Sequence, residues 1–234
     1  GACRDEIRLY ANINRATRGD RSPEAFARNA TAAVSDGFDA IKLAPFDGLA
    51  RGIDKAEDAA DGIACMQAVR QAIGPNVDLL IDCHSHFTAK GALAVAKALA
   101  DLDLFWFEEP VPDEDIAGYL EVKAKSGLPI AGGESRMHRR GFWQACNDNI
   151  LDIAMPDVTI VGGICELKKV AAMAEARGIR TAPHGPFGPV TTASSVHAMA
   201  AHPAFAILEY AWGEVPWRPT LTLPNEKISN GRIT

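Results

Sequence analysis

Asp78-Leu79-Leu80-Ile81-Asp82 and Leu104-Phe105-Trp106-Phe107-Glu108 are two short apolar runs that each end in a carboxylate. A third carboxylate, Glu134, follows Ile130-Ala131-Gly132-Gly133, and the three acids are spaced at equal intervals of about 26 residues. That interval accommodates one strand, one helix and two loops, which is the repeat of a parallel α/β fold. Because the carboxyl ends of parallel strands meet at one edge of the sheet, the three acids are predicted to form one cluster.

The predicted acidic cluster is a candidate metal site. Negative charges gathered in a cleft are strongly unfavourable unless a cation neutralises them. Carboxylate oxygens are the ligands that hard divalent cations prefer. Asp82, Glu108 and Glu134 are therefore predicted to bind one divalent metal ion, whereas isolated acids such as Asp78, Asp101 and Asp103 are interpreted as solvated surface charges.

Composition narrows the class of protein. The 234 residues are 47% hydrophobic and 23% charged, as in a globular domain. No apolar run is long enough to cross a membrane, and a net charge of −6 argues against nucleic acid as a partner. The five cysteines are scattered without zinc-type spacing. They are interpreted as small buried residues in a reducing compartment, so a cytoplasmic location is expected.

Strand and helix patterns alternate along the chain, which predicts a parallel sheet with crossover helices. Eight strand-like segments end near Tyr10, Leu43, Asp82, Phe107, Gly132, Met155, Ala182 and Leu208. This count predicts an α/β barrel of the TIM type, (β/α)8 or a modified (β/α)7β form, over residues 1–212. Residues 213–234 depart from this spacing. Their prolines and Asn230-Gly231 predict a C-terminal extension, made of a loop and a hairpin, that packs against the barrel or a capping region.

The spacing of polar residues continues beyond the three acids. Asp157, His184 and Glu209 follow at similar intervals, so polar groups end the predicted strands three to eight in sequence. In a barrel these strand ends converge on one cavity. Taken singly, Asp157 could be a turn residue, His184 a loop histidine and Glu209 an exposed glutamate.

Six motifs, in order along nearly the whole chain, carry a family resemblance: Ile81-Asp82-Cys83-His84, Phe107-Glu108-Glu109-Pro110, Gly133-Glu134-Ser135, Ala154-Met155-Pro156-Asp157, Gly162-Gly163 and Ala182-Pro183-His184-Gly185. The chain resembles the barrel domain of the enolase superfamily, and within it the mandelate racemase subgroup. The resemblance implies Mg²⁺ bound by the three acids named above. It also implies that an α+β capping domain, built in the family mainly from the N-terminal region, is missing here, and that the protein is a homo-oligomer.

The resemblance further implies roles for three other residues. His184 is expected to be a base oriented by Asp157, and Glu209 is expected to hydrogen-bond the substrate carboxylate. The chemistry is consistent with this expectation, since removing a proton next to a carboxylate builds a second negative charge, which a divalent cation stabilises. A histidine bonded to an aspartate has its tautomer fixed and its basicity raised.

His84 distinguishes among subgroups. It lies two residues after Asp82, so strand alternation predicts that both side chains point to the same side. A histidine beside the metal can protonate a departing hydroxyl, and Asp-x-His resembles the pattern of galactonate and mannonate dehydratases, where this histidine is the general acid. The alternative is a strand histidine with ordinary hydrogen bonds.

Position 44 departs from the family pattern. Many members carry Lys-x-Lys on the second strand, whereas this chain has Lys42-Leu43-Ala44. An alanine cannot accept a proton, so racemisation by two bases is disfavoured, and elimination with one base remains. Lys42 is expected either near the substrate carboxylate or in a buried ion pair. Glu109 is expected to pair with a lysine or arginine.

Three functions remain open at this point. The leading hypothesis is a Mg²⁺-dependent acid-sugar dehydratase that converts an aldonate such as galactonate into a 2-keto-3-deoxy acid. The second is a racemase or epimerase of a hydroxy acid on the same scaffold. The third is a metal-binding barrel without catalytic activity.

Overall fold

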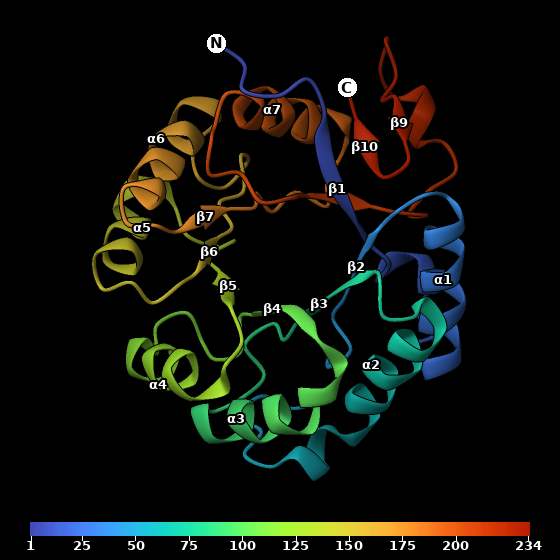
Figure 1. Cartoon of the computed structure of the whole chain (residues 1–234), viewed down its shortest axis with the longest axis vertical. Coiled ribbons are helices and arrows are strands. Elements are labelled where there is room, and N and C mark those ends of the chain that lie inside the picture. Colours follow the sequence, from blue (N-terminus) through green and yellow to red (C-terminus); the bar gives the residue numbers. More distant parts are fainter.

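Eight parallel strands form a closed ring in the computed structural model, which describes residues 1–234 (Figure 1). The strands are β1 (Ile7–Asn12), β2 (Ala40–Leu43), β3 (Asp78–Asp82), β4 (Leu104–Glu108), β5 (Ile130–Gly132), β6 (Ile153–Ala154), β7 (Arg180–Thr181) and β8 (Leu208–Ala211). Each strand from β1 to β6 pairs with the next, and β8 pairs with β1. A bridge between Thr181 and Phe205 closes the ring between β7 and β8.

Seven α-helices surround the ring, one in each connection between consecutive strands (Figure 1). They are α1 (Pro23–Ser35), α2 (Ala60–Ile73), α3 (Ala89–Ala98), α4 (Ile116–Ser126), α5 (His138–Asn147), α6 (Ile164–Glu175) and α7 (Pro189–Ala200). No α-helix follows β8. The predicted α/β barrel is therefore confirmed, in its (β/α)7β form.

Local sequence explains where the helices begin. The Ser22 hydroxyl accepts a hydrogen bond from the Ala25 amide at 3.2 Å, and Pro23 occupies the first turn of α1. α2 begins only at Ala60, after a 3₁₀ turn (Ala56–Ala59). The backbone before that turn is held extended, since Ile53 forms a bridge with Phe87.

The inside of the barrel is filled by a layer of apolar side chains. Tyr10, Ala40, Leu80, Trp106, Ala131, Ile153, Met155, Ala182 and Ile207 make up this cluster. On strands β2, β3 and β4, the residue two positions further on faces the same side and is Lys42, Asp82 or Glu108. The charged residues at the carboxyl ends of these strands thus lie directly above the apolar layer inside the barrel.

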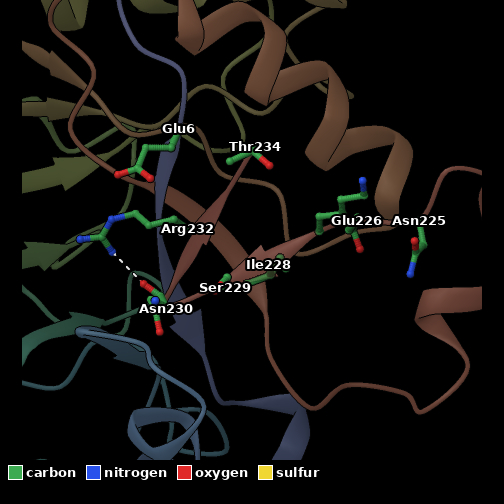
Figure 2. Close-up of a pocket in the computed structure, with 9 residues that line it drawn as sticks. Glu6, Asn225, Glu226, Ile228, Ser229, Asn230, Arg232 and Thr234 are labelled. Carbon is green, nitrogen blue, oxygen red and sulfur yellow. Dashed lines mark hydrogen bonds between the residues drawn. The ribbon is translucent and has the colours of Figure 1, made fainter.

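The segment after β8 contains a 3₁₀ turn (Arg218–Thr220) and a hairpin of β9 (Ile228–Ser229) and β10 (Arg232–Ile233). β10 pairs antiparallel with the beginning of β1, opposite Ile7 and Arg8. A cavity of about 700 Å³ lies beside this hairpin and is lined by Glu6, residues 225–230, Arg232 and Thr234 (Figure 2). It lies at the amino-terminal end of β1, away from the strand ends that carry the predicted site. None of the helices combines the length and apolar composition needed to cross a bilayer.

Candidate active site

A cavity of about 360 Å³ opens at the carboxyl ends of the strands. Its thirteen lining residues come from strands and loops that are far apart in sequence: Asn12, Asn14, Arg15, Arg21, Lys42, Asp47, Asp82, His84, Glu134, His184, Pro186, Phe187 and Glu209. Of the predicted site residues, only Glu108 and Asp157 are absent from the lining. Both are fully buried and contact residues that do line it.

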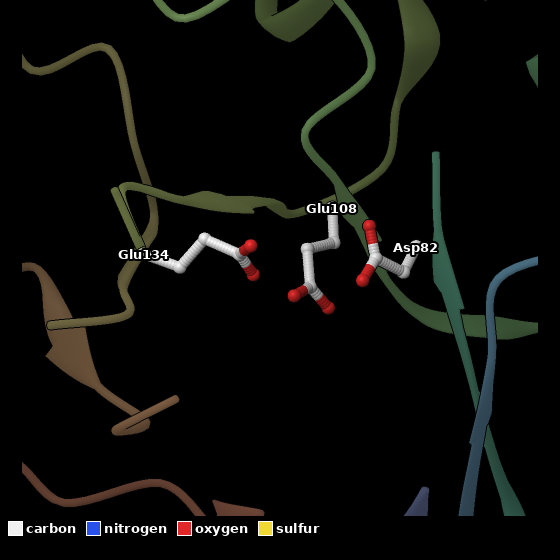
Figure 3. Close-up of side chains that lie close together, drawn as sticks. All are labelled: Asp82, Glu108 and Glu134. Carbon is white, nitrogen blue, oxygen red and sulfur yellow. The ribbon is translucent and has the colours of Figure 1, made fainter. Parts of the chain in front are cut away.

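The three predicted metal ligands lie together (Figure 3). Asp82 and Glu108 are paired at the ends of β3 and β4, and Glu134 follows β5 by two residues. Each of the three offers one ligand atom within 4.8 Å of the others. Burial and the neighbouring Asp82 carboxylate raise the pKa of Glu108 well above its ordinary value.

The donor set of this cluster fits a hard divalent cation such as Mg²⁺. All three groups are carboxylates, the oxygen donors that such ions prefer. Moreover, Oε2 of Glu134 is buried and has no hydrogen-bond partner. Its close polar neighbour is Nε2 of His184 at 3.3 Å, and a cation would supply the contact that a buried carboxylate oxygen needs. Asp82, Glu108 and Glu134 would therefore hold the ion.

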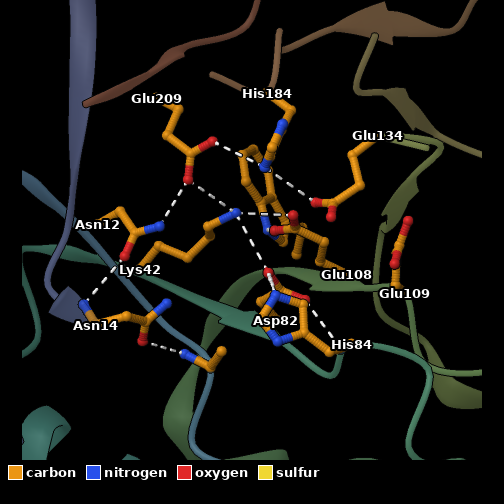
Figure 4. Close-up of polar contacts among 12 residues, drawn as sticks. Asn12, Asn14, Lys42, Asp82, His84, Glu108, Glu109, Glu134, His184 and Glu209 are labelled. Atoms are coloured by element: carbon orange, nitrogen blue, oxygen red, sulfur yellow. Dashed lines mark hydrogen bonds and ion pairs between the residues drawn. The ribbon is translucent and has the colours of Figure 1, made fainter. Parts of the chain in front are cut away.

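Lys42 lies among these carboxylates and is fully buried. Its Nζ is 2.8 Å from Oε1 of Glu108, 3.2 Å from Oε1 of Glu209 and 3.5 Å from Oδ2 of Asp82 (Figure 4). Although burial opposes the charged form, Glu108 and Glu209 raise the pKa of Lys42 well above its ordinary value. Of the two arrangements expected for Lys42, the structure has the buried ion pair.

His184 and Asp157 form a hydrogen-bonded pair. Nδ1 of His184 lies 2.7 Å from Oδ2 of Asp157, whose other oxygen accepts hydrogen bonds from the amide and hydroxyl of Thr159. Nε2 of His184 faces Glu134 Oε2 at 3.3 Å and Glu209 Oε2 at 3.7 Å. Burial lowers the pKa of His184, but Glu209, Asp157 and Glu134 outweigh it and raise the pKa to about 9.

His84 lies on the other side of the acidic cluster. Its Nε2 is 3.0 Å from Oδ2 of Asp82, and its Nδ1 is 2.5 Å from Oδ1 of Asp47. The explanation by strand alternation was wrong, because β3 ends at Asp82 and His84 adopts a left-handed backbone with φ of 42°. Its amide instead donates to Oδ1 of Asp82 at 3.0 Å. Burial opposes protonation of the ring, but Asp47 and Asp82 raise the pKa of His84 to about 11.

Glu209, at the second residue of β8, is fully buried rather than exposed. Oε1 accepts a hydrogen bond from Nδ2 of Asn12 at 2.8 Å, and Oε2 accepts one from the Gly185 amide at 2.9 Å. Burial would raise the pKa of Glu209, yet Lys42 and His184 lower it to about 2. The group is thus an ionised acceptor that links Lys42 to the loop carrying His184.

The expected ion pair of Glu109 with a lysine or arginine is wrong. Glu109 is buried, its φ is 41°, and its side chain accepts a hydrogen bond only from the Gly133 amide at 3.4 Å. Burial, then Glu134 and Asp82, raise the pKa of Glu109 to about 7. The turn after β4 directs this carboxylate away from the basic residues.

Several residues of the cavity, at the end of β1 and on the loops after β1 and β2, were not predicted from the sequence. Asn12, Asn14, Arg15, Arg21 and Asp47 line it, and none belongs to a motif with a recognisable spacing. One signal was available, because Asn12 ends β1 as Asp82 ends β3 and Glu108 ends β4. Asp47 could not have been found in this way, since it lies four residues beyond β2.

Comparisons with known proteins agree with this geometry. The D-gluconate dehydratase of Thermoproteus tenax is 33% identical over 234 residues, which cover 100% of this chain and 46% of that protein. The D-galactarolactone cycloisomerase of Agrobacterium fabrum is 31% identical over 249 residues, covering 100% of this chain and 61% of that protein. The chain thus spans about half the length of the curated relatives it matches.

Structural comparison gives the same answer. The crystal structure of a mandelate racemase/muconate lactonizing enzyme from Jannaschia sp. CCS1 is 32% identical, has a TM-score of 0.90, and is matched over 100% of this chain and 62% of that one. The family model described as enolase C-terminal domain-like matches residues 25–234. The fold, the order of the strand-end residues and these matches lead to one conclusion: the chain belongs to the enolase C-terminal domain-like family, within the mandelate racemase-like branch of the enolase superfamily.

Proposed function

We propose that the chain forms the catalytic barrel of a Mg²⁺-dependent acid-sugar dehydratase. Such an enzyme removes the α-proton of an aldonate, galactonate or a related sugar acid, and eliminates the β-hydroxyl to give a 2-keto-3-deoxy acid. One observation carries the proposal: two histidines, His84 and His184, lie on opposite sides of the acidic cluster, each with Nε2 within 3.3 Å of a predicted metal ligand. An elimination needs one group to take a proton and another to give one.

The proposed roles follow from the contacts of each ring. His184 takes the α-proton at Nε2, while Asp157 accepts the hydrogen bond from Nδ1 and fixes the tautomer. His84 gives a proton from Nε2 to the departing hydroxyl, which leaves as water. Mg²⁺ held by the three carboxylates would supply positive charge for the negative charge that develops on the substrate carboxylate. Lys42 positions the carboxylates of Asp82 and Glu108, and Glu209 positions the loop that carries His184.

The relatives support an acid-sugar substrate. One is named a D-gluconate dehydratase and another a D-galactarolactone cycloisomerase. The racemase or epimerase alternative lacks a second base, because Ala44 offers only a buried methyl group at the position of the family's second lysine. We therefore favour elimination over inversion at the α-carbon.

The decisive experiment uses the full-length protein with Mg²⁺ and a panel of aldonic and aldaric acids in D₂O. Formation of a 2-keto-3-deoxy acid, with deuterium entering the α-position of recovered substrate, is the expected result. Exchange with inversion and without loss of water would replace the dehydratase by a racemase or epimerase. An isomerised product without loss of water would indicate a cycloisomerase. Mg²⁺ binding without exchange or product would indicate a metal-binding barrel without catalytic activity.

A further inference from the structure

The two histidines of the site have matching surroundings. His184 binds Asp157 through Nδ1 and faces Glu134 through Nε2, at 2.7 and 3.3 Å. His84 binds a carboxylate through Nδ1 as well, that of Asp47, and faces Asp82 through Nε2 at 3.0 Å. Figure 4 shows the two rings on either side of the acidic side chains. The site thus contains a second histidine–aspartate pair that no family motif identifies.

Asp47 is itself held in place by a cation. Its Oδ1 contacts His84, and its Oδ2 lies 3.2 Å from a terminal nitrogen of Arg21. The same nitrogen donates a hydrogen bond to the carbonyl oxygen of Ala44, and the guanidinium lies 5.3 Å from the centre of the Phe26 ring. Both carboxylate oxygens of Asp47 are therefore engaged, and its orientation is fixed by groups on two other loops, those after β1 and β3.

The backbone of Ala44, to which Arg21 is hydrogen-bonded, is also held in place; we call the contact of Arg21 with Asp47 the clamp. The amide of Ala44 donates to Oδ1 of Asn14 at 2.7 Å, so the backbone after β2 is tied to the loop after β1. Arg21 then connects that backbone to Asp47. Only main-chain atoms of Ala44 take part, so these contacts do not depend on the side chain at position 44.

We infer that Asp47, clamped by Arg21, is a positioning residue that directs Nε2 of His84 into the cavity for protonation of the leaving hydroxyl. This inference rests on the proposed dehydratase function. Because Asp47 accepts the hydrogen bond from Nδ1, the proton available to the substrate is the one on Nε2. The carbanionic electron pair left at the α-carbon forms the new C=C bond, the β C–O bond breaks, and its electron pair leaves with oxygen, which takes the Nε2 proton and departs as water.

The inference predicts that the two proton transfers can be separated by mutation. In the full-length protein, Asp47→Ala should lower kcat for elimination by about 10²-fold, the loss expected when a reacting group is misplaced by about 1 Å. Exchange of the α-proton in D₂O should stay within about twofold of the wild type, because His184 and Asp157 are unchanged. Asp157→Ala should lower both rates. Asp47→Glu, which keeps the carboxylate, should restore part of the loss.

Two further variants sharpen this test. Asp54→Ala removes an exposed aspartate of the same β2–α2 connection that does not line the cavity, and it should leave both rates unchanged. Arg21→Ala should lower elimination less than Asp47→Ala, and the double variant should be no worse than Asp47→Ala alone, since the clamp acts only through Asp47. Additive losses would show that Arg21 acts independently and would overturn the clamp.

A second measurement does not depend on turnover. The chain has six histidines, so selective ¹⁵N labelling of histidine with assignment by His84→Asn can follow the two ring nitrogens of His84. Asp47→Ala should move those resonances, whereas Asp54→Ala should not. Unmoved resonances, or elimination at wild-type rate in Asp47→Ala, would overturn this inference alone. A wild-type protein that eliminates nothing would overturn the dehydratase proposal, and this inference with it.

Discussion

Nζ of Lys42 lies 2.8 Å from Oε1 of Glu108, and neither side chain has contact with solvent. The same ammonium group is close to Asp82 and Glu209. Lys42 therefore compensates part of the negative charge at the end of the barrel before any substrate binds. A fixed cation in this position favours the charged form of Glu108, although burial and the neighbouring Asp82 carboxylate outweigh it and raise the pKa of Glu108.

Replacing Lys42 by methionine should destabilise the protein by about 3–5 kcal/mol, since removing one partner leaves buried charges uncompensated. Urea unfolding at neutral pH without divalent cations measures this loss. Lys168→Met, at an exposed lysine on α6 without an ion pair, is the matched control and should change stability by less than about 0.5 kcal/mol. A Lys42→Met protein as stable as the control would show that the buried ion pairs contribute nothing.

Trp106 offers a direct optical signal of metal binding. Its indole nitrogen donates a hydrogen bond to Oε2 of Glu108 at 2.9 Å, so an ion that reorients this carboxylate changes the surroundings of the indole. Mg²⁺ should change the tryptophan fluorescence and raise Tm, with a stabilisation of about 2.7 kcal/mol at 100 times Kd. Trp106→Phe should remove the optical signal but keep the rise in Tm.

The metal ligands are tested by the same titration. Glu134→Gln removes a charge and a ligand oxygen, and it should abolish both the fluorescence change and the rise in Tm at millimolar Mg²⁺. Glu114→Gln, at an exposed glutamate before α4, is the control and should behave as the wild type. Equal Mg²⁺ responses in the two variants would remove Glu134 from the ligand set.

Substitutions of His184 and His84 should affect α-proton exchange and elimination differently. His184→Asn should abolish α-proton exchange and elimination together, by at least about 10²-fold, because it removes the base. His84→Asn should lower elimination while exchange continues, since it removes only the acid. Deuterium incorporation and product formation, measured on the same samples, separate the two effects. Undiminished exchange in His184→Asn would assign the base to another residue.

The sequence predicted the architecture because its physical signals are local. Asp78–Asp82 and Leu104–Glu108 are short apolar runs that end in a carboxylate, and Ala40–Leu43 lies shortly before Pro45. All three strands end within one residue of the predicted positions. The spacing of Asp82, Glu108 and Glu134 was sufficient to predict that they lie together. In a barrel, residues at the carboxyl ends of successive strands are neighbours at one end of the sheet.

The loops of the site were not predictable in this way. Asp47 meets His84 only because the backbone after β3 turns through a left-handed conformation, which places the ring toward the loop after β2. Glu109 avoids the basic residues for a similar reason, as its own φ is positive. Neither left-handed position is a glycine, so the sequence gives no signal of the turn. Side-chain contacts between loops depend on such turns rather than on strand periodicity.

Arg218 fastens the C-terminal segment to the barrel. It donates two hydrogen bonds of 2.8 Å to Glu226, one of 2.7 Å to the carbonyl of Phe187 and one of 2.9 Å to the hydroxyl of Thr192, and only 6% of its side chain is exposed. Arg218→Ala should lower the free energy of unfolding by about 3 kcal/mol, because it leaves the Glu226 carboxylate, whose side chain is only 10% exposed, without its partner.

Urea unfolding checks this prediction. Arg28→Ala on α1 is the control, since 66% of that side chain is exposed and its nearest carboxylate oxygen is 3.9 Å away. The control should change stability by less than about 1 kcal/mol. A similar small change for Arg218→Ala would mean that the C-terminal segment stabilises the barrel little.

Asp39, just before β2, should make stability depend on pH. It receives hydrogen bonds of 2.9 Å from Arg8 on β1 and from Arg232 on β10. Burial alone would raise the pKa of Asp39, but the two arginines outweigh it and lower the pKa. A carboxyl whose pKa is lower when folded stabilises the protein above its unfolded pKa of about 3.9, and that contribution is lost as the pH falls through the folded value.

The expected consequence is a pH-dependent difference between wild type and Asp39→Asn. Because 42% of the Asp39 side chain is exposed, the wild type should be more stable by no more than about 1 kcal/mol at pH 7. The difference should shrink as the pH is lowered from about 5 to below 3. Asp101→Asn, at an exposed aspartate after α3, should show no such trend. A constant difference for Asp39→Asn across this range would show that the arginines act on Asp39 through packing rather than charge.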